Sequence, residues 1–196
     1  MSTKEKAVNQ ITEGVIWKQL LFFFFPIMLG TLFQQLYNTA DAVVVGRFVG
    51  TRALAAVGGS TGQMVNLIVG FFVGLSSGAT VIIARYYGAK NKKDLNDTLH
   101  TAAALSVAGG ILITIAGILF TPSMLKIMKT PADVMADSAT YLRIYFGGII
   151  FVFIYNVGSA ILRAVGDSTR PLYFLIVCCF INIFLDVLLV VGFNMG

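Results

Sequence analysis

The chain has 196 residues, of which 57% are hydrophobic and only 12% are charged, and its mean hydropathy is +0.85. A water-soluble domain carries about 25% charged residues, so this composition excludes an ordinary soluble protein. The net charge of +5 does not require a nucleic-acid partner, because basic residues beside a membrane are attracted by anionic lipid headgroups.

Five runs along the chain are long and apolar enough to cross a bilayer. Four of these runs, at 19–40, 53–84, 98–125 and 144–162, contain no Asp, Glu, Lys or Arg, and the last one, at 171–196, contains only Asp186. The runs are continuously apolar and do not alternate, which favours helices over the strands of a membrane barrel. The sequence therefore predicts an all-α membrane protein, a bundle of five transmembrane helices with spans at about 15–46, 53–86, 95–121, 131–163 and 171–193.

Local signals place the ends of these helices. Asn91 or Asp94 is expected to cap the third helix, which should end near Thr121–Pro122. Thr130–Pro131 is typical of a cap and first turn, so we expect it to open the fourth helix. Gly166 suits the C-terminus of that helix.

The distribution of basic residues predicts the orientation of the bundle. If the polar segment 1–14 is cytoplasmic, nine of the 14 Lys and Arg residues lie on the cytoplasmic side and five lie outside. Cytoplasmic loops carry the excess of Lys and Arg, so this arrangement is the favoured one. The sequence thus predicts a multi-pass protein of the cell membrane with a cytoplasmic N-terminus and a single bundle over 15–196. Pro26 predicts a kink in the first helix.

Three glycines of the second predicted helix follow a doubled GxxxG pattern, Gly70, Gly74 and Gly78. Small residues on one face allow two membrane helices to approach closely. The pattern predicts helix packing within a bundle, and it does not by itself establish a dimer.

Motifs of soluble enzymes are missing from the sequence. There is one histidine and one adjacent pair of cysteines, and we find no zinc-binding, nucleotide-binding or phosphate-binding motif. We therefore expect no enzymatic activity and no organic cofactor.

Polar side chains inside the predicted spans carry the strongest functional signal. Asp41 shares one helix face with Gln34 and Asn38, and Asn182 precedes Asp186 by one turn. A carboxylate exposed to lipid costs several kcal/mol, so both acids are expected to face the interior and to form a cation or proton site. For Asp41 alone, a position at the membrane surface is the alternative, since its helix ends soon afterwards. The other polar residues within the spans are Tyr37, Gln63, Asn66 and Asn156.

Four segments resemble a known family in their order along the chain. "LGTLFQQLYNTADAVVVGRFVGTRALAAVG" at 29–58 is similar to the first-helix signature of the multidrug and toxic compound extrusion (MATE) transporters. "RYYGAKN", "LRAVGDSTRP" and "FINIFLDVLLV" look like the signatures of the second, fourth and fifth helices. The resemblance covers nearly the whole chain.

The resemblance implies a fold, an activity and roles for particular residues. Family members have two six-helix lobes and export organic cations and other drugs in exchange for Na⁺ or H⁺, so this chain would be most of one lobe. Asp41 and Asp186 would be the coupling carboxylates, with Na⁺, where it is the coupling ion, bound by them and by Asn182. Tyr37 and Asn156 would be neighbours in that site, and the residues expected to line the substrate cavity are Gln34, Asn38, Gln63 and Asn66.

One departure from the family pattern concerns length, because the family has twelve helices and this sequence has five predicted spans. We therefore expect an N-terminal fragment or a truncated product that needs a C-terminal lobe for transport. Two alternatives remain open, a lobe of a lipid-linked oligosaccharide flippase of the same superfamily and a non-transporting membrane protein. The expected partners are small, mainly cationic molecules and membrane lipid, and no nucleic acid.

Overall fold

The structure is a computed structural model that describes residues 15–193, and within that range the chain forms helices and turns with no strand. The predicted cytoplasmic segment 1–14 lies outside the described residues. The elements in chain order are α2 (Ile16–Val44), the π-helix η1 (Val45–Val49), α3 (Thr51–Gly58), α4 (Ser60–Gly88), α5 (Lys92–Ile127), α6 (Met135–Ala164), α7 (Thr169–Asp186) and the π-helix η2 (Val187–Gly192).

Within residues 15–193, five helical segments are long and apolar enough to cross a membrane, which agrees with the predicted number of spans. The predicted second span is interrupted at Gly59, which separates the short α3 from α4. The third span does not end at Pro122, because α5 continues to Ile127. Membrane helices tolerate proline where neighbouring groups compensate for the lost hydrogen bond, and Leu125, beyond the proline, is fully buried in the core.

The ends of the other helices follow local chemistry. The Asn91 side chain accepts a hydrogen bond from the backbone N–H of Asp94 and caps α5, as predicted. Gly166 has φ +89° after the end of α6, a conformation that glycine adopts at no steric cost. The predicted opening of α6 at Thr130–Pro131 is wrong, since these residues form a separate turn and the helix begins at Met135.

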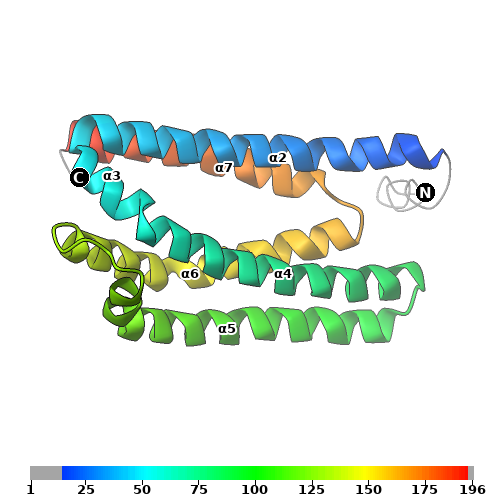
Figure 1. Ribbon diagram of the computed structural model, residues 1–196. Helices are drawn as coiled ribbons and strands as arrows, with labels where there is room; N and C mark the ends of the chain where they lie inside the picture. The colour runs from blue at the N-terminus through cyan, green and yellow to red at the C-terminus, as the bar shows by residue number, and fades with distance from the viewer. Residues whose placement is uncertain (1–14, 194–196) are drawn as a thin grey trace.

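The helices form two groups that run roughly parallel to one long axis (Figure 1). α2 and α7 lie side by side and run in the same direction, while α4, α5 and α6 pack against one another in the second group. One end of the bundle carries the turns α4–α5 and α6–α7 with Arg85, Lys90, Lys92, Lys93 and Arg170, and we call it the basic end. The opposite end carries η1, α3, the α5–α6 turn and η2.

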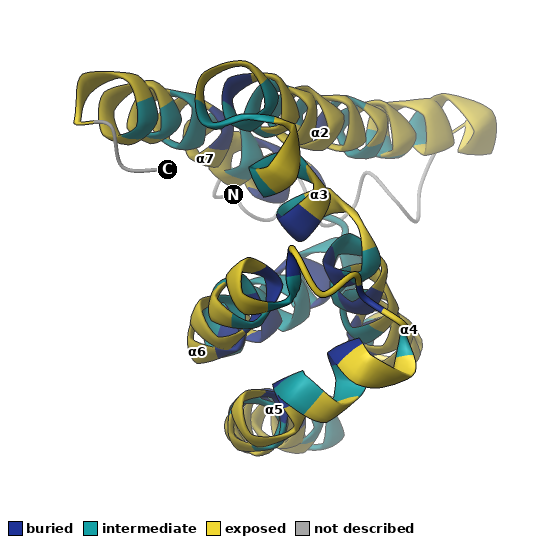
Figure 2. Ribbon diagram, turned by 60° about the vertical axis from the view of Figure 1, so that its left-hand side comes forward, coloured by how far each residue is buried: buried dark blue, intermediate teal, exposed yellow. Residues whose placement is uncertain are grey.

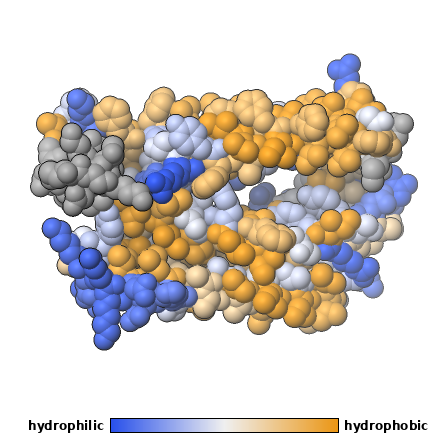
Figure 3. All heavy atoms as spheres, turned by 180° about the vertical axis from the view of Figure 1, so that it is seen from behind, coloured by the Kyte–Doolittle hydropathy of each residue, from blue (hydrophilic) through white to orange (hydrophobic). Residues whose placement is uncertain are grey.

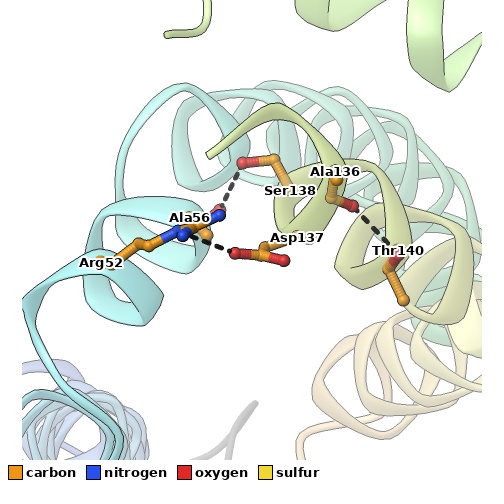
Figure 4. Close-up of polar contacts among 6 residues, drawn as sticks. All are labelled: Arg52, Ala56, Ala136, Asp137, Ser138 and Thr140. Atoms are coloured by element: carbon orange, nitrogen blue, oxygen red, sulfur yellow. Dashed lines mark hydrogen bonds and ion pairs between the residues drawn. The ribbon is translucent and has the colours of Figure 1, made fainter. Parts of the chain in front are cut away.

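At the opposite end, α3 connects the two groups by attaching to the start of α6 (Figure 4). The Ser138 hydroxyl donates a hydrogen bond of 3.2 Å to the carbonyl of Ala56, and both residues are buried. Arg52 and Asp137 form an ion pair at 3.3 Å, with side chains 65% and 52% exposed. Because an exposed ion pair contributes only about 0–1 kcal/mol, the buried Ser138 contact carries more of this attachment.

The packed core lies within the second group of helices. Phe146, Leu142 and Ile149 of α6 are fully buried and contact Met64 and Phe72 of α4. Most residues on the outside of the bundle are exposed (Figure 2), and the surface seen from behind is an apolar band with polar atoms at both ends (Figure 3). This distribution is that of a protein whose outer surface is solvated by lipid.

The glycines predicted to pack helices are not the ones that do so. A Cβ atom at Gly70, Gly74 or Gly78 would meet no heavy atom within 4 Å among the described residues. The close contacts are made on α5, where Gly110 lies against Ile150 and Gly117 lies against Phe146. A GxxxG spacing shows that a close approach is possible, but the side chains of the neighbouring helix decide where one is made.

Replacing Gly117 with Ala is expected to destabilise the bundle by about 1–3 kcal/mol, the usual cost of overpacking a filled core. The added Cβ would overlap the ring of Phe146, which is fully buried in the core. Gly147→Ala is the matched control, because a Cβ there meets nothing within 4 Å. Thermal unfolding of the purified variants in one detergent measures the difference, and equal midpoints would contradict the tight contact.

Candidate cation site

Two carboxylates meet where α2 and α7 run side by side. Asp41 lies near the end of α2, and Asp186 is the last residue of α7. Asp41 is close enough to interact directly with the Asp186 carboxyl group and with the Asn182 side chain. Asn182 and Asp186 face α2 together because they are one helical turn apart. The structure therefore brings together the two acids and the amide that the sequence singled out.

The site presents side-chain oxygen atoms without a partner among residues 15–193. One side-chain oxygen each of Asp41, Asn182 and Asp186 is buried and accepts no hydrogen bond from this part of the chain. A buried polar atom without a partner is costly, so such atoms call for a missing cation, proton or water. Hard cations take carboxylate and amide oxygens as ligands, and two adjacent carboxyl groups also share a proton readily. The residues present fit either coupling ion.

Phenol groups from α2 and α6 lie near the acid pair. Tyr37 lies on α2 within interaction distance of Asp41 and Gln34. Its proximity to Asp41 agrees with the sequence-based expectation. Tyr141 of α6 is close enough to Asp41 to sense its charge, and Tyr145 is similarly close to Tyr37. The rings of Tyr141 and Tyr145 are stacked with centroids 6.3 Å apart.

Tyr141 and Tyr145 were not predicted as site residues. Their signal in the sequence is a pair of phenols one turn apart in an apolar helix. That signal is weak by itself, because Tyr commonly lies at membrane interfaces. Only the tertiary structure shows that Tyr141 lies within electrostatic range of Asp41, and Tyr145 within electrostatic range of Tyr37.

The remaining predicted residues are half-buried or exposed, and the hydrogen bonds of Asn156 and Asn38 stay within their own helices. Asn156 is half-buried on α6, and its amide donates a 2.8 Å hydrogen bond to the carbonyl of Val152 in its own helix. Asn38 is exposed on α2 and donates to Gln35. Gln63 and Asn66 are exposed on α4, and no hydrogen bond joins either of them to the acid pair within residues 15–193.

Each of the two acids lies close to a π-helix. η1 begins four residues after Asp41, η2 begins immediately after Asp186, and the two π-helices contact each other. A π-helix carries one extra residue in a turn, and such segments are frequent at functional sites because they re-aim neighbouring side chains. The helix ends beyond the acid pair are therefore less regular than the spans before it.

Apolar helices with half-buried acids inside their spans define a class, the multi-pass membrane proteins, in which such polar groups are candidates for an ion or substrate site. The model of the MatE family matches residues 26–188. The chain therefore belongs to the MatE family of multidrug efflux transporters, and it is not an enzyme.

Named relatives agree with this assignment. The chain is 34% identical over 192 residues to the "Probable multidrug resistance protein YoeA" of Bacillus subtilis, covering 97% of this chain and 41% of the relative. It is 28% identical over 177 residues to a "Probable multidrug resistance protein NorM" of Thermotoga maritima, covering 90% and 38%. The chain thus spans about two fifths of the length of these relatives.

Solved structures share the fold. A crystal structure of a MATE protein in complex with MaD3S superposes with a TM-score of 0.89 and 29% identity, over 97% of this chain and 42% of that one. A MOP superfamily transporter from Pyrococcus furiosus superposes with a TM-score of 0.87 and 29% identity, again over 97% of this chain and 42% of that one. The five-helix bundle is thus the fold of part of a MATE transporter.

Proposed function

We propose that this chain is the N-terminal lobe of a cation-coupled multidrug efflux antiporter that works by alternating access and exports small organic cations. One observation carries the proposal. Three buried oxygens without partners, from Asp41, Asn182 and Asp186, converge between α2 and α7. Family membership supports drug export as the activity, and the acid pair is where the driving ion would bind.

In this proposal, the acid pair alternates between an ion-bound state and an ion-free state. Two adjacent carboxylates repel each other when both are ionised, and a proton or Na⁺ removes that repulsion. Ion binding therefore favours a close approach of α2 and α7, and ion release favours their separation. Substrate would bind between this lobe and a second one, with Gln34 and Asn38 on the exposed side of α2.

The flippase alternative receives less support from the residues around the site. A carrier of anionic lipid-linked sugars needs cationic groups in its cavity. The groups around the acid pair are carboxylates, an amide and phenols. This set complements a cationic substrate and a cationic coupling ion.

The test is drug efflux by a full-length carrier that contains this chain, reconstituted into vesicles with an imposed Na⁺ gradient or an imposed pH gradient. Efflux that follows one of the two gradients supports the proposal and identifies the coupling ion. Efflux that follows neither gradient, or that requires ATP, would contradict it.

We also propose that the basic end of the bundle is cytoplasmic, which follows from the positive-inside rule. In a variant with Cys178→Ala and Cys179→Ala, a membrane-impermeant maleimide added to intact cells is expected to label Asp133→Cys. It should not label Lys92→Cys until the membrane is permeabilised. Both positions are exposed and lie at opposite ends of the bundle, so the reverse labelling pattern would overturn the orientation.

A further inference from the structure

A second site lies away from the acid pair, in a groove between α4, α5 and α6. The groove has a volume of about 560 Å³, which falls within the range of about 300–1,000 Å³ typical of small-molecule sites. Its wall is mostly apolar, and the rings of Phe72 and Phe153, with centroids 3.5 Å apart and planes tilted by 31°, lie at one end of it. Asp97 and Tyr86 lie at the other limit, toward the basic end.

The length of the groove matches one leaflet of a bilayer. From Phe72 to Tyr86 the α4 wall rises by about 21 Å. One leaflet contributes roughly 15 Å of hydrocarbon, half of the core, and a headgroup layer beyond it. The groove therefore extends from near the middle of the membrane to the headgroup region at the basic end.

A glycine makes room in the groove. Gly78 lies on the α4 wall, and a Cβ atom there would meet no heavy atom within 4 Å in the described part of the chain. The missing side chain leaves a slot between α4 and α5 that is open along the helix. A flexible, linear apolar group suits such a slot better than a rigid ring system does.

The polar limit of the groove has a distinctive charge pattern. Asp97 is exposed, and its carboxylate takes part in no ion pair or hydrogen bond within the described residues. Lys93 precedes it by one helical turn, and Arg85, Lys90 and Lys92 lie nearby at the α4–α5 turn. A free carboxylate thus lies one helical turn from a lysine and near the basic α4–α5 turn, and within the described residues none of these cations pairs with it.

This pattern favours a headgroup with both charges. A purely cationic amphiphile would be attracted by Asp97 but repelled by the basic turn around it. A purely anionic lipid would be attracted by the basic turn but would leave Asp97 unpaired. A headgroup with an ammonium next to a phosphate can pair with both charges, the ammonium with Asp97 and the phosphate with Lys93. The two residues are one turn apart on the same helix face.

We propose that this groove binds a phosphatidylethanolamine molecule, with one acyl chain along the Gly78 slot, the ammonium group on Asp97 and the phosphate toward Lys93. The primary ammonium donates hydrogen bonds to the carboxylate, which the quaternary ammonium of phosphatidylcholine cannot do. Tyr86 has a phenol at the same level of the groove and is available to the phosphate. The site is separate from the acid pair and does not rest on the antiport function.

The experiment is native mass spectrometry of the purified 196-residue chain in detergent, titrated with phosphatidylethanolamine, phosphatidylcholine or phosphatidylglycerol that carry identical acyl chains. We expect one molecule of phosphatidylethanolamine to bind about tenfold more tightly than either of the others, the factor that a single charge-assisted hydrogen bond provides. Equal affinities for the three lipids would overturn the proposal.

Variants separate the headgroup contact from the slot. Asp97→Asn is expected to remove the preference for phosphatidylethanolamine, whereas Asp97→Glu, which keeps the charge, should retain most of it. Gly78→Leu fills the slot and should weaken binding of all three lipids at least tenfold. Gly74→Leu, on α4 but outside the groove, and Asp133→Asn, an exposed acid at the opposite end, are matched controls that should behave like the parent chain.

Other occupants of the groove give different results. If dodecyltrimethylammonium displaces the lipid with equal affinity and requires Asp97, the groove takes cationic amphiphiles and the lipid assignment is wrong. If the parent chain forms lipid-free dimers that Gly78→Leu disrupts, a second copy occupies the groove. Circular dichroism of each variant confirms that the helices are retained, so a loss of lipid binding reports on the site itself.

Discussion

Replacing Asp41 with Asn is expected to abolish ion-driven drug efflux by a full-length carrier that contains this chain, while insertion into the membrane is unaffected. The substitution keeps the shape of the side chain but removes the charge that a proton or Na⁺ would neutralise. The new amide is also able to donate a hydrogen bond to the neighbouring carboxylate of Asp186. The site would then remain in a state that resembles the ion-bound one.

Asp186→Asn should have nearly the same effect, because the two carboxylates belong to one site. The double variant should therefore lose little more than either single variant, in contrast to the additive losses of independent residues. The measurement is efflux rate in vesicles under an imposed ion gradient, with Asp133→Asn as the control for removing an exposed acid. Full efflux by Asp41→Asn, or losses that multiply in the double variant, would show that the acids do not act together.

Expression of residues 1–196 alone is expected to give no drug resistance to a host that lacks its own efflux pumps. Alternating access requires two bundles that rock against each other around a central site. The chain spans about two fifths of the length of its relatives and forms one bundle. The ion site on α2 and α7 can be complete in this bundle, but the second wall of a substrate cavity would be missing.

The measurement is the minimal inhibitory concentration of a cationic drug, with a membrane fraction blotted to show that the chain is inserted. A full-length relative such as the Bacillus subtilis protein, expressed at the same level, serves as the positive control. Resistance from residues 1–196 that disappears with Asp41→Asn would contradict the expectation. It would mean that the bundle pairs with itself or with a host protein to complete a carrier.

Part of the acid-pair site could be predicted because its signal is local. A carboxylate in an apolar span is costly, which favours an interior position for it. The one-turn spacing of Asn182 and Asp186 places both on one face without any knowledge of the neighbouring helices. By contrast, nothing local to Tyr141 shows that it lies within electrostatic range of Asp41, because that proximity depends on how α6 is placed relative to α2.

The sequence by itself determined the number of spans, the helical class and the two acids, since these follow from long apolar runs and from the cost of placing charge in lipid. The tertiary structure decided which glycines contact a neighbouring helix and where α5 ends. Gly117 contacts a neighbouring helix and Gly74 does not, because Phe146 lies opposite only the first of them. α5 continues past Pro122 because Leu125 is buried beyond it. Packing between distant segments outweighs local propensity at such positions, and a single sequence records propensity more directly than packing.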